Sequence, residues 1–377
     1  MRILHVTNDM EVGGVQVYLA QLLPALAARG HEVGLVVLTG QGSLLSALDA
    51  TGIPNRYIKA IARYQGLKFP RVAAIHEVRS YIDEQFSPDV LHSHLFIGNT
   101  VARLAAGRRA RRRPVVIATE HSTYYHKPTW AQSLDRLLTR NSDAIMAVSD
   151  AVRDFTLAQE HLDPKKVVTV RLGLVPQQGG SEEPDEGLYD AMRRRPTVAI
   201  IGRLIEEKGH HLFLHTLAAL LAEDPEILGL VIGDGPLRAD LQALADQLWL
   251  GPNNVKFLGT RTDIAALTKR LDVFLLPSKR EGFGMAPLEA MAGGATVVLS
   301  CIPAFEELTD NGRMGRLVGL DRSISEWKNV VLDALRHPID RESLRQFVRE
   351  RYEFNQHVDQ LVNLYQRLLR RKGVDLA

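Results

Sequence analysis

The stretch that decides the fold is Val273–Gly294, VFLLPSKREGFGMAPLEAMAGG. It opens with an apolar run typical of a buried strand, and the residues after Gly284 are helix formers with Pro287 in the first turn. The glycines between the two runs predict a strand, a tight turn and then a helix. Glu281 precedes this turn, and Glu289 falls in the first turns of the helix.

The predicted turn is suited to binding an anion or a ring of hydroxyls, because backbone N–H groups at a helix N-terminus lie at the positive end of the helix dipole. Those N–H groups belong to Gly282, Phe283, Gly284 and Met285. Glu289 can accept hydrogen bonds from a ribose diol, and Glu281 can reach a sugar beyond the phosphates. The structural alternative is a surface glutamate before a loop and a glutamate that complements the helix N-terminus.

The composition is that of a globular protein. We expect two domains, because 377 residues exceed the roughly 100 to 200 of an ordinary domain. A total of 46 Lys and Arg against 44 Asp and Glu leaves no global field to recruit nucleic acid. The N-terminal apolar run is too short for a signal peptide, and no apolar run reaches the roughly 18 residues of a membrane span. We therefore expect a cytoplasmic protein. Cys301, the only cysteine, excludes an internal disulfide and is predicted to be a core thiol.

The first half of the chain predicts a parallel sheet with right-handed crossovers. Ile3–Val6 is expected to be a strand and Leu19–Ala28 a helix, with Gly13 and Gly14 in the loop between them. Paired glycines let a ligand approach the backbone closely, although for this pair taken alone a plain turn is the favoured interpretation.

Three further strands are each expected to end in polar residues, which are His94, Glu120, His121 and Ser149. Ligands of an open parallel sheet bind beyond the carboxyl ends of its strands, so these side chains are expected at one rim. A neutral imidazole at His121 could bond a sugar hydroxyl or a backbone carbonyl near the reacting carbon. For His92 and His94 we favour a structural role.

A basic run, Arg108–Arg113, precedes the strand that begins after Pro114. Without interleaved aromatic residues it is expected to be a solvated loop. The alternative is a weak contact with an anionic acceptor or a membrane surface.

The second half begins after the polar, acidic stretch 177–195, which we interpret as the linker between the domains. Beyond it, Arg203 and Lys208 are five positions apart on one loop flanked by glycines. Two such cations suit a diphosphate, because Arg can bind it through two nitrogens and Lys adds a point charge. An ordinary charged turn is the alternative.

Three later features complete the pattern. A strand ends at Gly233 in GDGP, which is not a dinucleotide fingerprint and argues against a dehydrogenase. Another strand leads to Thr260 and Arg261, followed by a helix that Thr262 or Asp263 is expected to cap. The apolar spacing over Phe354–Arg371 predicts an amphipathic packing helix.

Several motifs together resemble those of the retaining GT-B glycosyltransferases of family 4. They are GGVQ at 13–16, TEH at 119–121, VSDAVRD at 148–154, GRLIEEKG at 202–209, GDGP at 233–236 and EGFGMAPLE at 281–289. The most specific part is the spacing of Glu281 and Glu289 combined with Arg203 and Lys208. The resemblance extends over nearly the full length of the chain.

The resemblance implies an α/β fold of two facing Rossmann-like domains with a cleft between them and a C-terminal helix that crosses back to the first. It places the acceptor-side domain at 1–176, joined by 354–377, the linker at 177–195 and the donor-binding domain at 196–353. Such enzymes lack a metal-binding DxD motif, which this sequence also lacks. We therefore expect no metal and no other cofactor.

The resemblance also assigns roles to residues. Arg203 and Lys208 would hold the donor diphosphate, and Glu289 the ribose. Glu281 and the backbone of Phe283–Met285 would bind the sugar hydroxyls, with Gly282 as a further donor contact, and His121 would lie by the reacting face of the sugar. The remaining donor contacts are expected from Gly13, Gly14, Gly233, Thr260 and Arg261.

The function implied is a metal-independent, retaining transfer of a hexose or N-acetylhexosamine from a nucleotide diphosphate sugar to an acceptor hydroxyl. The acceptor would be a sugar, a lipid-linked group or a small molecule. One alternative is a nucleotide-sugar epimerase of the same fold, and another is a catalytically silent subunit that binds a sugar nucleotide.

Overall fold

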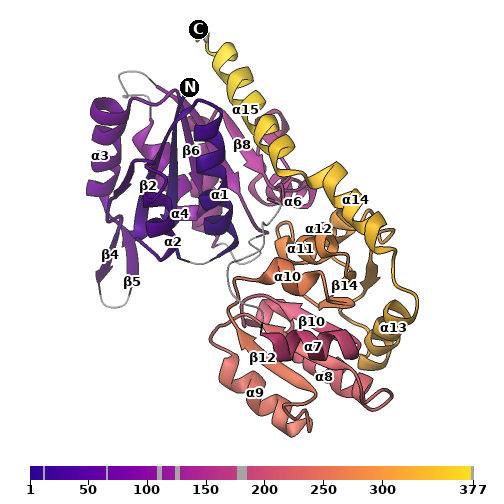
Figure 1. The fold of residues 1–377 in the computed structure, drawn as a ribbon. Helices are drawn as coiled ribbons and strands as arrows, with labels where there is room; N and C mark the ends of the chain where they lie inside the picture. The colour runs from indigo at the N-terminus through magenta and orange to yellow at the C-terminus, as the bar shows by residue number, and fades with distance from the viewer. Residues whose placement is uncertain (12, 65–66, 108–112, 124–127, 176–184, 375–377) are drawn as a thin grey trace. The chain divides into compact units, whose positions relative to one another are not determined.

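The computed structural model describes residues 1–374 apart from 12, 65–66, 108–112, 124–127 and 176–184. The chain forms two compact units. Unit 1 comprises Met1–Gly173 and Phe354–Ala377, and unit 2 comprises Leu174–Glu353. Each unit is a parallel sheet with helices packed on it (Figure 1). This is the α/β architecture that the sequence predicts.

The sheet of unit 1 has the strand order β3-β2-β1-β6-β7-β8-β9, with every neighbouring pair parallel. From β1 the chain crosses to β2 on one side, whereas from β6 it crosses to β7 on the other. The direction of winding therefore reverses between β1 and β6, which is where open sheets bind ligands. The strands are β1 (Arg2–Asp9), β2 (Glu32–Gly40), β3 (Asn55–Tyr57), β6 (Val90–His94), β7 (Val115–Glu120), β8 (Ala144–Ala147) and β9 (Val167–Thr169), and a separate hairpin pairs β4 (Ile61–Tyr64) with β5 (Leu67–Pro70).

The helices of unit 1 cover this sheet and bury apolar side chains against it. They are α1 (Gly14–Ala28), α2 (Leu44–Asp49), α3 (Val72–Ser80), α4 (Leu95–Ala105), α5 (Thr129–Leu138), α6 (Asp150–Glu160) and α15 (Phe354–Arg371). Helix α1 begins five residues before the predicted Leu19, because Gly13 is its N-cap and the first turns bury the polar Gln16 with Tyr18. A pattern based on apolar residues alone could not show that start.

Helix α15 has the predicted bounds, Phe354–Arg371, and packs on unit 1. Its apolar face is buried, and two of its polar side chains reach the core of the unit. His357 Nε2 lies 2.9 Å from the Tyr18 hydroxyl, and the Tyr365 hydroxyl lies 2.6 Å from His92 Nδ1. The end of the chain is thus part of the first structural unit.

The sheet of unit 2 has the order β12-β11-β10-β13-β14-β15 and is also parallel throughout. Its winding reverses between β10 and β13. The strands are β10 (Thr197–Ile201), β11 (Leu228–Ile232), β12 (Val255–Gly259), β13 (Val273–Leu276), β14 (Thr296–Ser300) and β15 (Arg316–Val318). The helices are α7 (Glu186–Arg194), α8 (His210–Leu221), α9 (Arg238–Gln247), α10 (Ile264–Thr268), α11 (Met285–Gly293), α12 (Pro303–Leu308), α13 (Ile324–Arg336) and α14 (Arg341–Tyr352).

Helix α7 lies within the stretch that the sequence suggested was linker. Residues 176–184 lie outside the described residues, but Glu186–Arg194 is helical and buries Leu188, Tyr189 and Met192. The Tyr189 hydroxyl donates to Asp263 Oδ2 at 2.6 Å. Three apolar side chains are enough to hold a short helix against unit 2, although the stretch as a whole is polar.

Cys301 corrects another prediction, because it is exposed rather than part of the core. Strand β14 ends at Ser300, so Cys301 is the first residue beyond the sheet. Its thiol lies 3.4 Å from Glu306 Oε1. The apolar neighbours that suggested burial belong to the strand alone.

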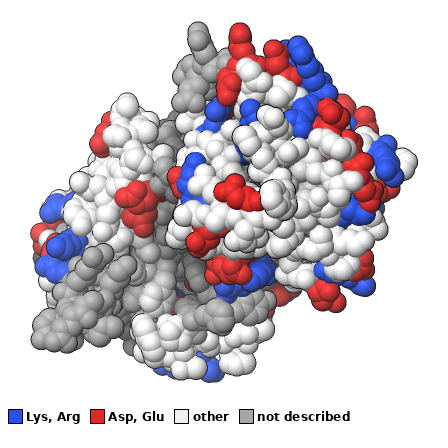
Figure 2. All heavy atoms as spheres, turned by 90° about the horizontal axis from the view of Figure 1, so that it is seen from below, with Lys and Arg blue, Asp and Glu red and all other residues white. Residues whose placement is uncertain are grey.

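The charged surface agrees with the small net charge of +2. On the face shown in Figure 2, basic and acidic side chains are interspersed among the described residues. Of the basic run, residues 108–112 lie outside the described residues, while Arg113 donates to the carbonyl of Asn141 at 2.9 Å. Among the helices of the described residues, none is both long enough and apolar enough to cross a membrane.

Candidate functional site

The reversal point of the unit 2 sheet brings together the charged residues that the sequence singled out. The loop after β10 carries Arg203 and Lys208, and the loop after β13 carries Glu281. Lys208 Nζ lies 2.5 Å from Glu281 Oε1, and the Ser278 hydroxyl donates to the same oxygen at 2.9 Å. The side chains of Lys208 and Glu281 are 25% and 12% exposed, so this ion pair is largely screened from solvent. Residues 73 positions apart therefore meet where a ligand is expected.

This pair is one of three that join the same two loops. The triplet Glu-Glu-Lys at 206–208 faces the triplet Lys-Arg-Glu at 279–281, and each residue meets the one 73 positions later. The backbone N–H of Lys279 also donates to the carbonyl of Glu207 at 2.8 Å. We call this set the ion-pair ladder; its pairs are Glu206–Lys279 at 2.6 Å, Glu207–Arg280 at 3.0 Å and Lys208–Glu281 at 2.5 Å. The sequence analysis missed it, although the complementary charges of the two triplets were visible.

Two glycines let the loops of this site pack closely. Gly209 has φ of 74°, and a Cβ there would lie 2.2 Å from the carbonyl oxygen of Pro277. Gly284 has φ of 97° and immediately precedes Met285, the first residue of α11. L-residues rarely adopt these angles, and the Gly209 position leaves no space for a side chain. The strand, turn and helix predicted at Val273–Gly294 are thus confirmed.

Arg203 differs from Lys208 because its side chain has no partner in the part of the chain that the structure describes. Its side chain is exposed and makes no hydrogen bond or ion pair with the described residues. Lys208, by contrast, is neutralised by Glu281. The site therefore offers one available guanidinium and one ammonium that an anionic ligand would have to share with a carboxylate.

Phe283, predicted to contact a donor, has a side chain that is only 4% exposed. It packs edge-on against Tyr352, with ring centroids 5.5 Å apart. Any ligand contact at Phe283 must therefore come from its backbone. Gly282 and Met285 lie beside it in the same turn.

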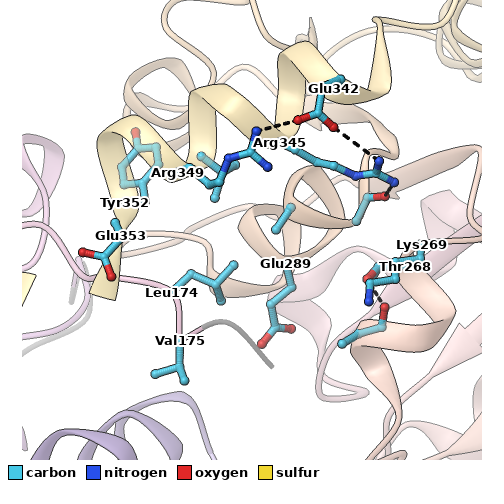
Figure 3. Close-up of a pocket in the computed structure, with 14 residues that line it drawn as sticks. Leu174, Val175, Thr268, Lys269, Glu289, Glu342, Arg345, Arg349, Tyr352 and Glu353 are labelled. Carbon is cyan, nitrogen blue, oxygen red and sulfur yellow. Dashed lines mark hydrogen bonds and ion pairs between the residues drawn. The ribbon is translucent and has the colours of Figure 1, made fainter. Parts of the chain in front are cut away.

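Glu289 lies in the second turn of α11 and lines a cavity of about 610 Å³. Burial raises the pKa of its carboxyl to about 7. Figure 3 shows the carboxylate turned away from Arg345 and Arg349, which both bind Glu342. The rest of the cavity wall comes from α10, α11, α14 and the start of unit 2, including Ala265, Thr268, Ala292, Val348, Leu174 and Val175.

The loops after β11 and β12 hold the remaining predicted residues of unit 2. Gly233 donates through its N–H to the carbonyl of Gly259 at 2.7 Å, and Thr260 is exposed. Arg261 binds Asp263 through two nitrogens, at 2.8 and 2.6 Å. This pairing lowers the pKa of the Asp263 carboxyl.

The carboxylate of Asp263 therefore does not act as predicted. Asp263 is the N-cap residue of α10, but its side chain makes no capping hydrogen bond. It is occupied by Arg261 and Tyr189 instead. The guanidinium of Arg261 is likewise committed to an internal ion pair.

In unit 1, Gly13 and Gly14 begin α1 directly after β1, next to the reversal of the sheet. A Cβ added at Gly14 would meet nothing within 4 Å, so the space around that residue is open. Nearby, Gln16 donates to Asp9 Oδ1 at 2.9 Å. The geometry leaves room for a ligand at Gly14 without requiring one.

His121 follows β7 and is linked to two further histidines. Its Nε2 lies 3.0 Å from His94 Nδ1, and His94 Nε2 lies 3.0 Å from His5 Nδ1. Burial lowers the pKa of His5 and of His121 to about 3, so these imidazoles are neutral at physiological pH. His94 thus contacts a predicted site residue, which its expected structural role did not include.

The other two residues expected at this rim have structural partners. The Ser149 hydroxyl accepts from the N–H of Val152 at 3.0 Å and caps α6. Glu120 is buried and accepts from Asn99 Nδ2 at 3.3 Å. Of the four rim residues, His94 and His121 are thus the ones that the structure joins into one network.

Comparison with known proteins agrees with this arrangement in both halves of the chain. Residues 12–178 match Glycosyltransferase Family 4, and residues 190–351 match Glycosyl transferases group 1. The phosphatidyl-myo-inositol mannosyltransferase of Mycolicibacterium smegmatis is 30% identical over 322 residues, which cover 82% of this chain and 78% of that protein. The chain belongs to the group 1 glycosyltransferases.

This glycosyltransferase has further relatives over its full length. The N-acetyl-alpha-D-glucosaminyl L-malate synthase of Bacillus anthracis is 25% identical, and the match covers 97% of each chain. Among solved structures, Anabaena HepE in complex with UDP and glucose superposes with a TM-score of 0.80 at 19% identity, covering 97% of this chain and 99% of HepE. WaaG, a glycosyltransferase involved in lipopolysaccharide biosynthesis, gives 0.72 at 16%, with 96% and 99% covered. These structures share the GT-B fold with this chain.

Proposed function

We propose that this glycosyltransferase transfers a hexose or N-acetylhexosamine from a nucleotide diphosphate sugar to an acceptor hydroxyl. The observation that carries the proposal is the meeting of Lys208 with Glu281 at the reversal of the unit 2 sheet, on the loop that also carries Arg203, whose side chain has no partner among the described residues. HepE, whose fold is similar, has been solved with UDP-glucose, which supports a nucleotide sugar as the donor. The names of the relatives include lipid and small-molecule acceptors.

The catalytic task is to stabilise the negative charge that grows on the departing diphosphate. Arg203, Lys208 and the N-terminal end of α11 can supply positive potential for this without a metal ion. When the diphosphate binds Lys208, the hold of that ammonium on Glu281 weakens. Glu281 can then accept hydrogen bonds from the sugar hydroxyls, and Glu289 can accept from the ribose.

We further propose that transfer retains the anomeric configuration. The acceptor oxygen would bond to the anomeric carbon on the face from which the diphosphate leaves, as the bond from that carbon to the phosphate oxygen breaks. The acceptor proton would pass to the departing phosphate oxygen. This route requires no protein nucleophile and no protein base, and His121 would contribute a hydrogen bond to the transferred sugar.

The first experiment measures nucleotide release with and without a panel of acceptors. The donors are first screened by thermal shift with UDP-, GDP- and dTDP-sugars, because a ligand at about 100 times its Kd adds roughly 2.7 kcal/mol of apparent stability. We expect rapid release only when an acceptor is present, together with a new glycoside. Epimerised donor formed without acceptor would indicate the epimerase, and binding without any turnover would indicate a silent subunit.

The second experiment tests stereochemistry and metal independence on the same reaction. Proton NMR of the first-formed product from an α-linked donor should show an α-linked glycoside, and activity should persist in excess chelator. A β-linked product would contradict retention. Loss of activity in chelator, restored by magnesium or manganese, would contradict the metal-free mechanism.

A further inference from the structure

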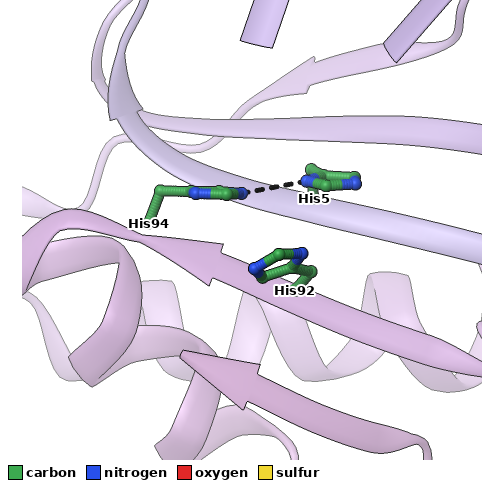
Figure 4. Close-up of side chains that lie close together, drawn as sticks. All are labelled: His5, His92 and His94. Atoms are coloured by element: carbon green, nitrogen blue, oxygen red, sulfur yellow. Dashed lines mark hydrogen bonds between the residues drawn. The ribbon is translucent and has the colours of Figure 1, made fainter. Parts of the chain in front are cut away.

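Three imidazoles from consecutive neighbours in the unit 1 sheet form a single hydrogen-bonded chain. His5 lies on β1, His94 ends β6 and His121 follows β7. The chain runs from His5 Nδ1 to His94 Nε2 at 3.0 Å and from His94 Nδ1 to His121 Nε2 at 3.0 Å. Figure 4 shows the bond between His5 and His94, whose side chains are completely buried. Glycosyl transfer as proposed above uses only the last member, His121.

The two ends of the chain have different surroundings. Nε2 of His5 is buried and has no hydrogen-bond partner. Nδ1 of His121 likewise has no partner among the described residues, but His121 itself is partly exposed. One end of the chain is therefore closed in the core, and the other ends on a residue that solvent or a ligand can reach.

The protons in such a chain have only two consistent arrangements. A neutral imidazole carries one N–H and one lone pair, so each ring must donate on one side and accept on the other. In the first arrangement His5 carries its proton on Nε2, which would leave a buried donor without an acceptor. In the second, His5 donates from Nδ1 to His94, and His94 donates from Nδ1 to His121. The second leaves only a lone pair unsatisfied, and buried donors without a partner are the rarer and costlier case.

We propose that His5 and His94 are positioning residues that hold the proton of His121 on Nδ1, so that His121 presents a hydrogen-bond donor and cannot act as a general base. The inference rests on the proposed function in one respect, namely that the group which accepts this hydrogen bond is the transferred sugar. It excludes His121 as the base that deprotonates the acceptor in an inverting reaction. This agrees with the proposed retaining route, in which the proton of the acceptor passes to the departing diphosphate.

A bound cation is the other use for clustered imidazoles, and the nitrogens of His5, His92 and His94 do lie within 4.8 Å of one another. However, His92 already bonds the Tyr365 hydroxyl through Nδ1 and the Thr119 hydroxyl through Nε2. Both ring nitrogens of His94 are also engaged. A cation would have to break bonds at two of the three rings, so the geometry favours the hydrogen-bonded chain.

The test is nitrogen-15 NMR of the full-length protein labelled at histidine, because a protonated and a bare ring nitrogen have well-separated chemical shifts. His121 is assigned by loss of its signals in His121→Asn. We expect the proton on Nδ1 in the wild-type protein, without any substrate. A proton on Nε2 of His121 would overturn the proposal, as would a stoichiometric metal in protein purified without chelator.

Two matched variants on β6 then test whether the tautomer of His121 depends on the hydrogen-bonded histidines. His94→Phe should shift His121 toward a mixture of both tautomers and lower kcat about tenfold, the equivalent of one well-placed hydrogen bond, with KM for the donor nearly unchanged. His92 is as buried as His94 but does not belong to the hydrogen-bonded chain of His5, His94 and His121. His92→Phe should therefore leave the His121 signals in place. Unaltered signals in His94→Phe, or equal changes in both variants, would contradict the proposal. Because the NMR signals need no turnover, this result stands apart from a failure of the proposed function.

Discussion

At the reversal of the unit 1 sheet the polar side chains are buried imidazoles, whereas at the reversal of the unit 2 sheet they are charged groups in partly exposed loops. His5 and His94 are joined by a directional hydrogen bond within the core. Lys208 and Glu281 are joined by opposite charge at the rim. The same topology thus places its polar groups by two different kinds of force.

The difference follows from where the residues lie relative to the strand ends. His5 is in the middle of β1, where a charge would lose its hydration, so burial keeps the imidazole neutral. The ion-pair ladder lies beyond the ends of β10 and β13, where solvent still reaches the side chains. Unit 1 is therefore suited to orient a proton, and unit 2 to hold an anion.

The largest expected effect is the loss of the Arg203 side chain in unit 2. Arg203→Ala should lower the rate of transfer by roughly 10² to 10³, because it removes the charge that we propose faces the departing diphosphate. Lys279→Ala is the matched control, since Lys279 belongs to the ion-pair ladder but its exposed pair is worth only about 0 to 1 kcal/mol. Steady-state kinetics compares the two variants. If Arg203→Ala keeps near-native turnover, the diphosphate assignment fails.

We expect acid to destabilise unit 1 more than unit 2. The folded pKa of His5, about 3, lies below the unfolded value of 6.5, so its contribution is complete above pH 6.5 and is lost as the pH falls. At pH 5 the loss is about 2 kcal/mol for this one group. Among the described residues, burial lowers the pKa of five more histidines in unit 1 and of one, His210, in unit 2. The five in unit 1 are His31, His92, His94, His121 and His357.

Hydrogen exchange with mass spectrometry, corrected for intrinsic rates, can follow each unit between pH 7 and pH 5. We expect unit 1 to lose protection first. His5→Phe should reduce the pH dependence of the unfolding free energy by about 2 kcal/mol, because it removes one group that the unfolded chain protonates. Equal loss of protection in both units would show that the buried histidines do not make unit 1 the more acid-sensitive unit.

A smaller effect concerns Glu289 in the unit 2 site, whose pKa is raised to about 7 by desolvation. In the proposed contact a ribose diol donates to the ionised carboxylate, so nucleoside diphosphate affinity should rise with pH toward 7 and level off above it. We expect a rise of about tenfold between pH 5.5 and 7.5, equivalent to one pKa unit. Glu289→Gln provides the correction for ionisation of the phosphate itself. Calorimetric titration that shows the same pH profile in both proteins would argue against the ribose contact.

The smallest effect is expected at Glu281. Glu281→Gln frees Lys208 from its ion pair, so the nucleoside diphosphate should bind equally well or up to about threefold tighter. The intact nucleotide sugar should bind more weakly, because the variant lacks the carboxylate that we propose accepts from the sugar. Titration of the variant with both ligands decides the matter. Equal weakening of both would show that Glu281 and Glu289 do not have separate roles.

Much of the fold could be predicted because each motif is local. The strand, turn and helix around Glu281 and Glu289 follow from apolar runs and glycines within about twenty residues, and α15 has the bounds that its apolar spacing predicts. Helix α7 and the exposure of Cys301 were not predicted. For α7 the packing of three apolar side chains outweighed the polar character of the stretch, and for Cys301 the end of β14 at Ser300 decided the exposure.

The sequence by itself determined which residues carry charge and which loops they occupy, because β-strand and helix signals place Arg203, Lys208 and Glu281 after strands of a parallel sheet. Only the tertiary structure decided which of these residues are in contact. The pairing of 206–208 with 279–281 and the chain through His5, His94 and His121 both join strands that are neighbours in a sheet but distant in sequence. Strand order sets such contacts, and burial then decides whether the groups remain charged. Neither strand order nor burial is a property of a local run of residues.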